Sequence, residues 1–373
     1  MKKKILILTA SFGTGHLTAS RSIEEALLKF YPEELEIKTI DFIEIENFAF
    51  FGRISEKIYN FLMEYPYLWD FVFRVTDFKL WKSYYRTVFQ IFYKKAYKIL
   101  SSENPDLCIT IHPFWNFLID GYNKHLKEKK KYICVVTDAI QIHHVWITSG
   151  AEYYIVCDKD TADVMTRYNI DKNRTFAKGF PVSLRFSSQV SREKFLTELG
   201  LKPELTTFLI VIGLGDTRKF LKVINYLTKL HQMKFQLIII TGKYKNIYSK
   251  LANKSFLVPT KVVGWTDKMA ELIKSSDLVI SKGGGAIVME ALAAGKPVFI
   301  PVFTPGQERG NAELIKRYEF GFVERNFRKI TEMMRDLISN HESISKITNG
   351  VKEYSNPHAA EDIAKFAHDV IFE

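Results

Sequence analysis

Two short apolar runs, about 200 residues apart, each lead into a glycine-rich loop and then into a helical pattern. The first run, Ile5–Ala10, precedes Gly13-Thr14-Gly15-His16, and the second, Phe208–Ile212, precedes Gly213-Leu214-Gly215-Asp216. A strand that feeds a glycine loop and then a helix is the usual beginning of a Rossmann-like unit. No other feature constrains the fold as strongly, and the repeat predicts two doubly wound α/β domains that face one another.

The rest of the chain continues this pattern, because short apolar runs alternate with longer stretches of helical period. We expect an N-terminal domain of residues 1–185, a C-terminal domain of residues 186–355, and a C-terminal helix within residues 356–373 that could pack back on the first domain. That helix is predicted from about His358 to Ile371, after the break at Asn356-Pro357. The runs expected to form strands are Lys4–Thr9, Leu35–Ile40, Leu107–Ile111, Tyr132–Thr137, Tyr153–Cys157, Phe208–Gly213, Phe235–Thr241, Lys261–Gly264, Leu278–Ser281 and Pro297–Pro301.

The charge balance indicates an anionic partner. Of 373 residues, 53 are Lys or Arg and 42 are Asp or Glu, which gives a net charge of +11. Such a balance suits a nucleotide, a nucleic acid or an acidic membrane surface. Both halves of the chain carry the excess and no recognised nucleic-acid motif occurs, so we expect no nucleic-acid partner.

Three cysteines occur, Cys108, Cys134 and Cys157, and their spacing fits neither a metal site nor a disulfide framework. This favours a reducing cytoplasm. No run of 18 apolar residues and no signal-peptide pattern is found. We therefore expect a protein of the cytoplasm, or one that sits on a membrane without crossing it.

One stretch, between Phe48 and Tyr97, has 18 aromatic residues in 50, whereas aromatic residues make up 14% of the whole chain. We expect a helical insertion over about residues 48–100. Aromatic side chains at helical spacing usually form a core. Together with the basic residues of this stretch, they could instead dock on an anionic lipid surface. The pattern leaves both interpretations open.

A third glycine-rich loop, Ser281-Lys282-Gly283-Gly284-Gly285, lies between an apolar strand and a helical run. Consecutive glycines leave backbone N–H groups unshielded at a helix N-terminus, which favours a diphosphate over a simple tight turn. Arg218, at the helix start after the Gly213 loop, could neutralise phosphate or simply be solvated. Glu290, about one turn into the helix after the triple glycine, could accept both hydroxyls of a ribose.

Further polar residues follow at the start of the next helix. Gln307 and Glu308, with Asn311 one turn on, could read sugar hydroxyls. Glu308 could instead only stabilise the helix terminus.

Candidate proton-transfer groups follow the first-half strands. His16 lies on the first glycine loop, at the carboxyl end of the first strand, where doubly wound sheets bind ligands. A histidine suits proton abstraction at neutral pH, although a lone histidine after a strand is more often structural. Asp138 follows the Tyr132–Thr137 strand and could orient His16, act as the base itself, or contact hydroxyls. His112 and His143 also lie near strand ends and are interpreted as lining residues rather than catalysts.

These motifs resemble those of family 28 glycosyltransferases, in the branch of the monogalactosyldiacylglycerol synthases and bacterial diacylglycerol glucosyltransferases. The resemblance extends over nearly the whole chain, and its main departure is Gly283, where the branch usually has proline. The segments that carry it are Ile5–Ser11 with Gly13-Thr14-Gly15-His16, Ile111-His112-Pro113-Phe114, Val135-Val136-Thr137-Asp138 with His143 and Trp146, Gly179-Phe180-Pro181-Val182, Ser281–Ala291, Gly295-Lys296-Pro297-Val298 and Pro305–Ala312.

The resemblance implies a GT-B fold, in which two facing Rossmann-like domains enclose a cleft, with the acceptor in the first and the donor in the second. It implies no cofactor and no metal. Asp158-Lys159-Asp160 spells a metal motif of another transferase fold, but its position after a strand favours helix capping. Together with the flanking glycines, the resemblance favours His16 as the base. It further assigns Gly213, Gly215, Gly264 and Trp265 to the donor side and Gly15, His112, Pro113, His143 and Trp146 to the acceptor side.

The implied activity is the inverting transfer of a hexose from a UDP-sugar to diacylglycerol at the cytoplasmic face of the membrane, by a peripheral enzyme. The glycolipid product would be β-linked. One alternative is the transfer of N-acetylglucosamine to a lipid-linked peptidoglycan precursor, and another is a non-catalytic nucleotide-sugar sensor. Glucose and galactose are not distinguished by the sequence, because they differ in one epimeric hydroxyl.

Overall fold

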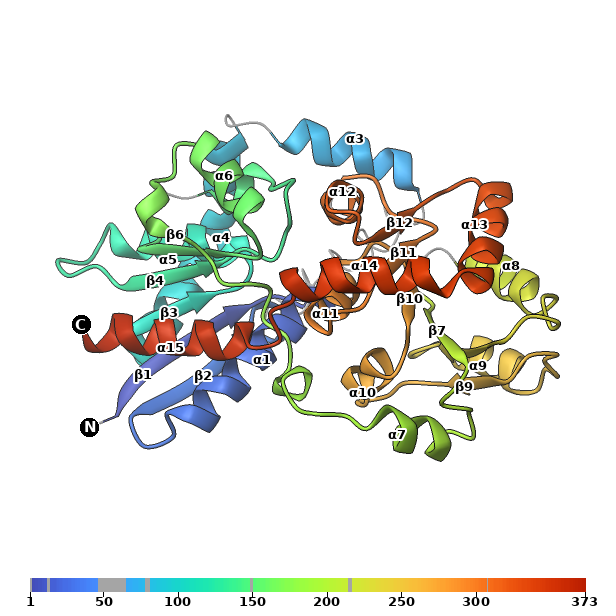
Figure 1. Cartoon of the computed structure of the whole chain (residues 1–373). Helices are drawn as coiled ribbons and strands as arrows, with labels where there is room; N and C mark the ends of the chain where they lie inside the picture. The colour runs from blue at the N-terminus through green and yellow to red at the C-terminus, as the bar shows by residue number, and fades with distance from the viewer. Residues whose placement is uncertain are drawn as a thin grey trace. The chain divides into compact units, whose positions relative to one another are not determined.

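The computed structural model describes residues 2–11, 14–45, 65–77, 81–147, 150–213, 217–306 and 308–373 (Figure 1). The chain divides into two compact units. Unit 1 comprises Met1–Leu184, Pro305–Gly310 and His358–Glu373, and unit 2 comprises Arg185–Thr304 and Asn311–Pro357. Each unit contains a six-stranded parallel sheet, so the α/β prediction is confirmed.

The sheet of unit 1 has the strand order β2-β1-β3-β4-β5-β6. Residues 5–8 of β1 are fully buried, as expected of a parallel strand that is covered on both faces. The strands are β1 (Lys3–Thr9), β2 (Leu35–Asp41), β3 (Leu107–Thr110), β4 (Lys131–Val135), β5 (Tyr153–Val156) and β6 (Thr175–Ala177). The helices described are α1 (Thr14–Phe30), α3 (Pro66–Thr76), α4 (Trp81–Glu103), α5 (Pro113–Asn123), α6 (Lys159–Arg167) and α15 (Ala359–Phe372). There are also short 3-10 turns, η1 (Phe42–Glu44), η2 (His144–Trp146), η3 (Lys172–Arg174) and η4 (Leu184–Phe186). The last of these turns continues into unit 2.

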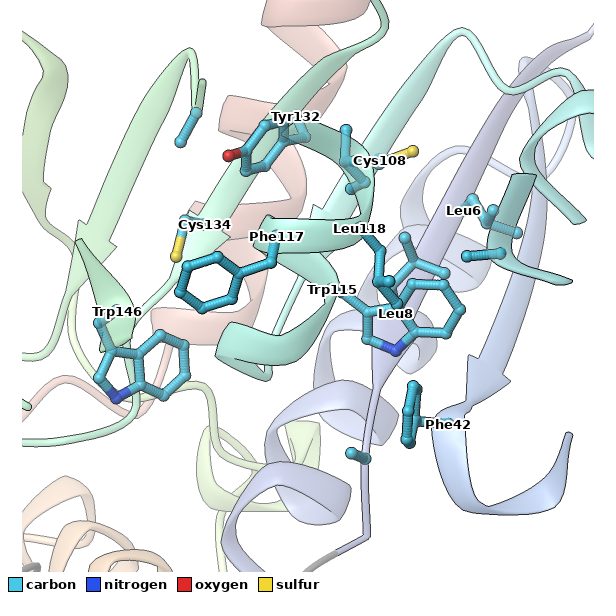
Figure 2. Packing of buried hydrophobic residues seen from close by; sticks show 14 of the residues in the cluster. Leu6, Leu8, Phe42, Cys108, Trp115, Phe117, Leu118, Tyr132, Cys134 and Trp146 are labelled. Carbon is cyan, nitrogen blue, oxygen red and sulfur yellow. The ribbon is translucent and has the colours of Figure 1, made fainter. Parts of the chain in front are cut away.

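One core cluster of unit 1 is formed by side chains of its sheet and of helices that include α4 and α5 (Figure 2). Trp115 of α5 is fully buried, and its indole Nε1 donates to the carbonyl of Thr9 at 2.8 Å. Phe42 packs edge-on against the same indole. The hydrogen bond and the packing fix the end of β1, from which the first glycine loop departs.

The sheet of unit 2 has the strand order β12-β11-β10-β7-β8-β9. Its strands are β7 (Thr206–Val211), β8 (Phe235–Ile240), β9 (Thr260–Val263), β10 (Leu278–Ser281), β11 (Val298–Ile300) and β12 (Gly321–Val323). Its helices are α7 (Arg192–Glu198), α8 (Thr217–Leu227), α9 (Lys245–Ala252), α10 (Met269–Lys274), α11 (Gly285–Ala293), α12 (Arg309–Arg317, which begins in unit 1), α13 (Phe327–Ser339) and α14 (His341–Tyr354).

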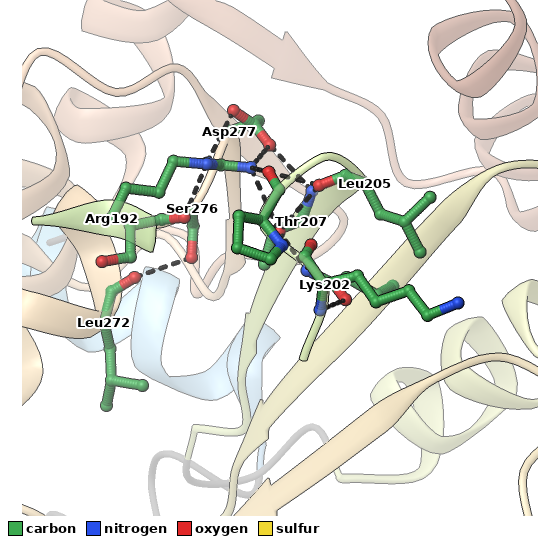
Figure 3. Close-up of polar contacts among 10 residues, drawn as sticks. Arg192, Lys202, Leu205, Thr207, Leu272, Ser276 and Asp277 are labelled. Atoms are coloured by element: carbon green, nitrogen blue, oxygen red, sulfur yellow. Dashed lines mark hydrogen bonds and ion pairs between the residues drawn. The ribbon is translucent and has the colours of Figure 1, made fainter. Parts of the chain in front are cut away.

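A polar network ties the amino ends of β7 and β10 to α7 (Figure 3). The Arg192 guanidinium binds both carboxylate oxygens of Asp277, at 3.0 and 2.9 Å. The same carboxylate accepts from the backbone N–H of Thr207 at 2.8 Å. A bidentate pair of this kind has strong geometric preferences. It therefore holds β7 and β10 in register at their amino ends, whereas the glycine loops follow their carboxyl ends.

All ten predicted strands are present, with ends that differ by a few residues. The prediction missed β6 and β12, which are three residues long and lie at sheet edges. The last helix, α15, matches its predicted range to within about a residue and packs on α1. Residues 305–310 group with unit 1, although the sequence analysis counted them in the second domain.

The described part of the aromatic stretch divides between the two interpretations. Phe92 of α4 is buried in the core, and Tyr93 and Tyr97 pack against it. On α3, by contrast, the Phe71 side chain is 64% exposed, so the core interpretation is wrong for this residue. Residues 48–64 lie outside the described residues.

Candidate active site

His16 lies in the first turn of α1, directly after the first glycine loop, and is buried. Its Nδ1 is 2.8 Å from the carbonyl oxygen of Ile111 and 3.1 Å from the Thr137 hydroxyl. A carbonyl can only accept, so the proton of the neutral ring resides on Nδ1. The lone pair therefore lies on Nε2, which is the nitrogen that a general base requires to be unprotonated.

Burial lowers the pKa of His16 to about 4, although the Ile111 carbonyl and the Asp41 carboxylate act in the opposite direction. The imidazole is therefore neutral at pH 7. The same two groups would stabilise the imidazolium that forms when Nε2 takes up a proton. Among the residues that contact His16, Thr137 could have been found from the sequence, because it ends a predicted strand just before Asp138.

Three more predicted residues lie at the same end of the sheet as His16. The His112 ring lies edge-on to it, with centroids 4.8 Å apart, and the Trp146 indole lies 5.9 Å away. Asp138, in the loop after β4, accepts from the indole Nε1 of Trp146 at 2.7 Å. The structure thus gathers His16, His112, Asp138 and Trp146 at the carboxyl ends of β1, β3 and β4.

The place in the sheet explains this cluster. β1 is flanked by β2 and β3, so the chain order reverses there, and open α/β sheets bind ligands at such a switch point. Among the described residues, nothing lies within 4 Å of a Cβ built on Gly15. No side chain in the described part of the chain therefore packs against Gly15.

Three of the predicted acceptor-side residues also have local structural roles. Nδ1 of His112 accepts from the Phe114 N–H and caps α5, which begins at the buried Pro113. His143 caps η2 by accepting from the Val145 N–H, and burial lowers its pKa. Their lining role stays a prediction.

In unit 2 the predicted phosphate loop lies at the corresponding switch point, between β7 and β10. A Cβ built on Gly213 would lie 3.3 Å from that of the buried Lys282, so the two loops are in close contact. Gly284 is the N-cap of α11 and supplies no side-chain cap. Within the described residues, the amides of Gly284 and Gly285 have no protein acceptor, whereas that of Gly283 donates to Val302.

Glu290 lies in the second turn of α11 and is partly exposed. Burial of its carboxyl raises the pKa to about 8. Asn311 is buried, and its Nδ2 donates to the carbonyl of Gly283 at 2.9 Å. Its Oδ1 has no hydrogen-bond partner in the described part of the chain. The structure thus brings Asn311, but not Glu290, into direct contact with the glycine loop.

The residues just before Asn311, 305–310, belong to unit 1, whereas Asn311 belongs to unit 2. A Cβ on Gly310 would lie 2.0 Å from the carbonyl oxygen of Ala139, so no side chain fits there. The buried Glu308 is two residues away, so within unit 1 it belongs to a segment that packs on the loop carrying Asp138.

The remaining donor-side predictions are more scattered. Gly264 and Trp265 follow the edge strand β9, and the Trp265 side chain is 68% exposed. Two strands separate β9 from β10, which corresponds to roughly 14 Å at the usual spacing. Only an extended ligand could contact both loops. Arg218 is exposed near the start of α8, and Gly215 and Gln307 lie outside the described residues.

No group of three His, Cys, Asp or Glu in the described ranges has the arrangement of a metal site. The Asp158 side chain accepts from the Thr161 N–H at 2.7 Å and caps α6, so the capping interpretation of Asp158-Lys159-Asp160 is confirmed.

Two family models match the chain. Residues 16–182 match monogalactosyldiacylglycerol (MGDG) synthase, and residues 207–361 match the glycosyltransferase family 28 C-terminal domain. The chain is 26% identical to monogalactosyldiacylglycerol synthase 3 of Arabidopsis thaliana, over 98% of this chain and 81% of that protein. It is 27% identical to a processive diacylglycerol beta-glucosyltransferase of Staphylococcus epidermidis, over 99% of this chain and 93% of that protein.

The fold is similar to that of MurG from Acinetobacter baumannii. The TM-score is 0.62 at 10% identity, and the match covers 98% of this chain and 99% of that one. Identity this low shows the GT-B fold alone. The two family models account for most of both units, and the chain therefore belongs to family 28 of the glycosyltransferases, in the branch of the monogalactosyldiacylglycerol synthases and bacterial diacylglycerol glucosyltransferases.

Proposed function

We propose that this protein is an inverting glycosyltransferase that moves a hexose from a UDP-sugar to diacylglycerol and forms a β-glycosyldiacylglycerol. The main support is His16, which is neutral, has its lone pair on Nε2, and lies near Trp146 at the switch point of unit 1. Asp138 accepts a hydrogen bond from the same Trp146. The relatives from Arabidopsis and Staphylococcus are named for this class of lipid.

In this reaction Nε2 of His16 takes the proton of the diacylglycerol hydroxyl. The hydroxyl oxygen forms a bond to the anomeric carbon while the bond from that carbon to the diphosphate oxygen breaks on the opposite face. The configuration therefore inverts in one step. The Ile111 carbonyl, which accepts from Nδ1, stabilises the resulting imidazolium.

Unit 2 would hold the donor. The free amides of Gly284 and Gly285 and the dipole of α11 can receive the negative charge that develops on the departing diphosphate. Glu290 is assigned to the ribose hydroxyls. A sugar hydroxyl that donates to Oδ1 of Asn311 would satisfy a buried acceptor that otherwise costs about 1–3 kcal/mol. We assign no metal and no cofactor to these steps.

Diacylglycerol stays in the bilayer, so the enzyme must reach it there. Among the described residues, no helix is long and apolar enough to cross a membrane. On α3, exposed apolar side chains recur at helical spacing, at Leu68, Phe71 and Val75, and Arg74 lies beside them. We assign this face, with the exposed Lys94 and Lys98 of α4, to docking on the anionic cytoplasmic face of the membrane.

The test is a transfer assay with radiolabelled UDP-glucose and UDP-galactose and with vesicles that contain diacylglycerol and anionic lipid. We expect a labelled β-glycosyldiacylglycerol from one of the two donors. Normal UDP-hexose binding without a lipid product would reject the proposal. A parallel assay with a lipid-linked peptidoglycan precursor and UDP-N-acetylglucosamine checks the alternative acceptor.

A further inference from the structure

The end of helix α3 is tied to the turn that carries Trp146. The Asp77 carboxylate, directly after α3, accepts at Oδ1 from the backbone N–H of His144 at 2.7 Å and from its Nδ1 at 2.9 Å. These residues are 67 positions apart in the chain, so the contact is tertiary. A charge-assisted bond to a backbone N–H fixes the main chain and not only a side chain.

A second contact runs beside the first. The Thr76 hydroxyl lies 3.2 Å from Nε2 of His143, and the Phe73 ring lies edge-on to the same imidazole, with centroids 4.9 Å apart. Nδ1 of His143 in turn accepts from the Val145 N–H. Two successive histidines of the loop are therefore held from α3.

The turn held in this way positions Asp138. His144–Trp146 form the 3-10 turn η2, and the backbone N–H of Trp146 donates to the carbonyl of His143 at 3.0 Å. The Trp146 indole is buried, and its Nε1 donates to Asp138 at 2.7 Å. A shift of the turn would therefore move the indole, which lies 5.9 Å from the His16 ring, and with it the Asp138 carboxylate.

We propose that Asp77 is a positioning residue for the transfer reaction, which acts through His144 and Trp146 on Asp138. This rests on the proposed function, because Asp138 belongs to the active site assigned there. A misplacement of about 1 Å in a reacting group can lower the rate about 100-fold. No pattern in the sequence singles out Asp77.

The helix that ends at Asp77 also carries the face that we assign to lipid contact. Asp77 ends the helix whose exposed face carries Leu68 and Phe71, which we assign to docking. The helix that would meet the bilayer is thus the one whose end holds the turn of Trp146, the residue that binds Asp138.

The test compares Asp77→Ala with Asp77→Asn, whose amide oxygen still accepts from the His144 N–H. The matched control is Asp171→Ala, because Asp171 also accepts from a backbone N–H in a 3-10 turn of unit 1, that of Asn173 in η3. Diacylglycerol is supplied in detergent micelles, so that docking does not limit the rate. Hydrogen exchange of a peptide covering 143–147 is followed in every variant.

For Asp77→Ala we expect kcat to fall about 10- to 100-fold with the KM for UDP-hexose within about twofold. Exchange of the 143–147 peptide should accelerate. Asp77→Asn should recover most of kcat, and Asp171→Ala should match the wild type. If Asp77→Ala does not fold, Thr76→Val tests the same tie at the neighbouring contact, with an expected several-fold fall in kcat at constant KM.

An unchanged kcat in folded Asp77→Ala, or in Thr76→Val when it stands in, overturns the proposal. So does unchanged exchange of the 143–147 peptide, or a fall in kcat accompanied by a matching rise in KM and a lower Tm. If the wild-type enzyme transfers no hexose, the proposed function fails instead. The exchange experiment then still decides whether Asp77 holds the turn.

Discussion

The two units place different kinds of chemical group at equivalent positions of their sheets. At the switch point of unit 1, the loops after β1, β3 and β4 present side chains: His16, His112 and Asp138. At that of unit 2, the loops after β7 and β10 present glycines, and two amides there have no protein acceptor among the described residues.

The difference corresponds to two chemical tasks. Taking a proton from an acceptor requires a titratable side chain whose protonation state is set by its surroundings. Stabilising a diphosphate requires several N–H donors close together, which bare main chain at a helix N-terminus supplies. The same strand–loop–helix unit can serve either purpose, depending on whether its loop carries side chains.

The strongest test of this division is His16→Ala. Loss of the general base should lower kcat by about 100- to 10,000-fold, while UDP affinity is retained, because UDP is assigned to unit 2. Transfer assays and calorimetry measure the two quantities. If His16→Ala were mild and Asp138→Asn were severe, the base would be Asp138.

A second prediction concerns the stability that His16 confers. Its pKa in the folded protein is about 4, below the usual 6.5, so the unfolded chain binds the proton first as the pH falls. The free energy of unfolding should therefore decrease between pH 6.5 and 4, and His16 should account for about 3 kcal/mol of that decrease. Urea unfolding of His16→Gln should show a shallower pH dependence. The matched control replaces the exposed His231 of unit 2 by Gln.

For unit 2, Glu290→Ala should weaken UDP binding by about 1–3 kcal/mol, through the loss of hydrogen bonds to the ribose. Because burial raises the pKa of Glu290 to about 8, the carboxyl of the free protein is largely protonated at pH 7. Hydroxyls that donate to the carboxylate favour its ionised form, so UDP binding should release a proton. Calorimetry in buffers of different ionisation enthalpy detects this release, which Glu290→Gln should abolish. Unchanged UDP affinity in Glu290→Ala would remove the ribose assignment.

The smallest expected effect concerns the docking face of unit 1. Phe71→Ser should weaken binding to anionic vesicles several-fold, because an exposed ring contributes about 25 cal/mol per Å² removed from water. The Tm should not change, since the side chain is largely exposed. Replacement of Tyr248, an exposed aromatic residue of unit 2, by Ser is the control for vesicle sedimentation. A large loss of Tm in Phe71→Ser would instead restore the core interpretation for α3.

Much of this architecture could be read from local sequence. The ten predicted strands are apolar runs long enough to be buried in a sheet, and the glycine loops follow them directly. β6 and β12 were not predicted because each is only three residues long. Each is recognisable as a strand only through its pairing with the neighbouring strand, β5 or β11. The sequence also places Asp138 and His112 at strand ends, which in a parallel sheet meet at one edge.

The fold class, the three glycine loops and most of the candidate site residues can therefore be predicted from the sequence, because they follow from short patterns. The tertiary structure decided which of them touch. The proton of His16 is placed on Nδ1 by a carbonyl 95 residues away, and Asn311 reaches Gly283 across 28 residues. It also decided that the Gly283 amide is used within the protein and that Asp77 holds the turn of Trp146. Hydrogen bonds and burial depend on distances between segments that the chain brings together only when it folds, so no local pattern encodes them.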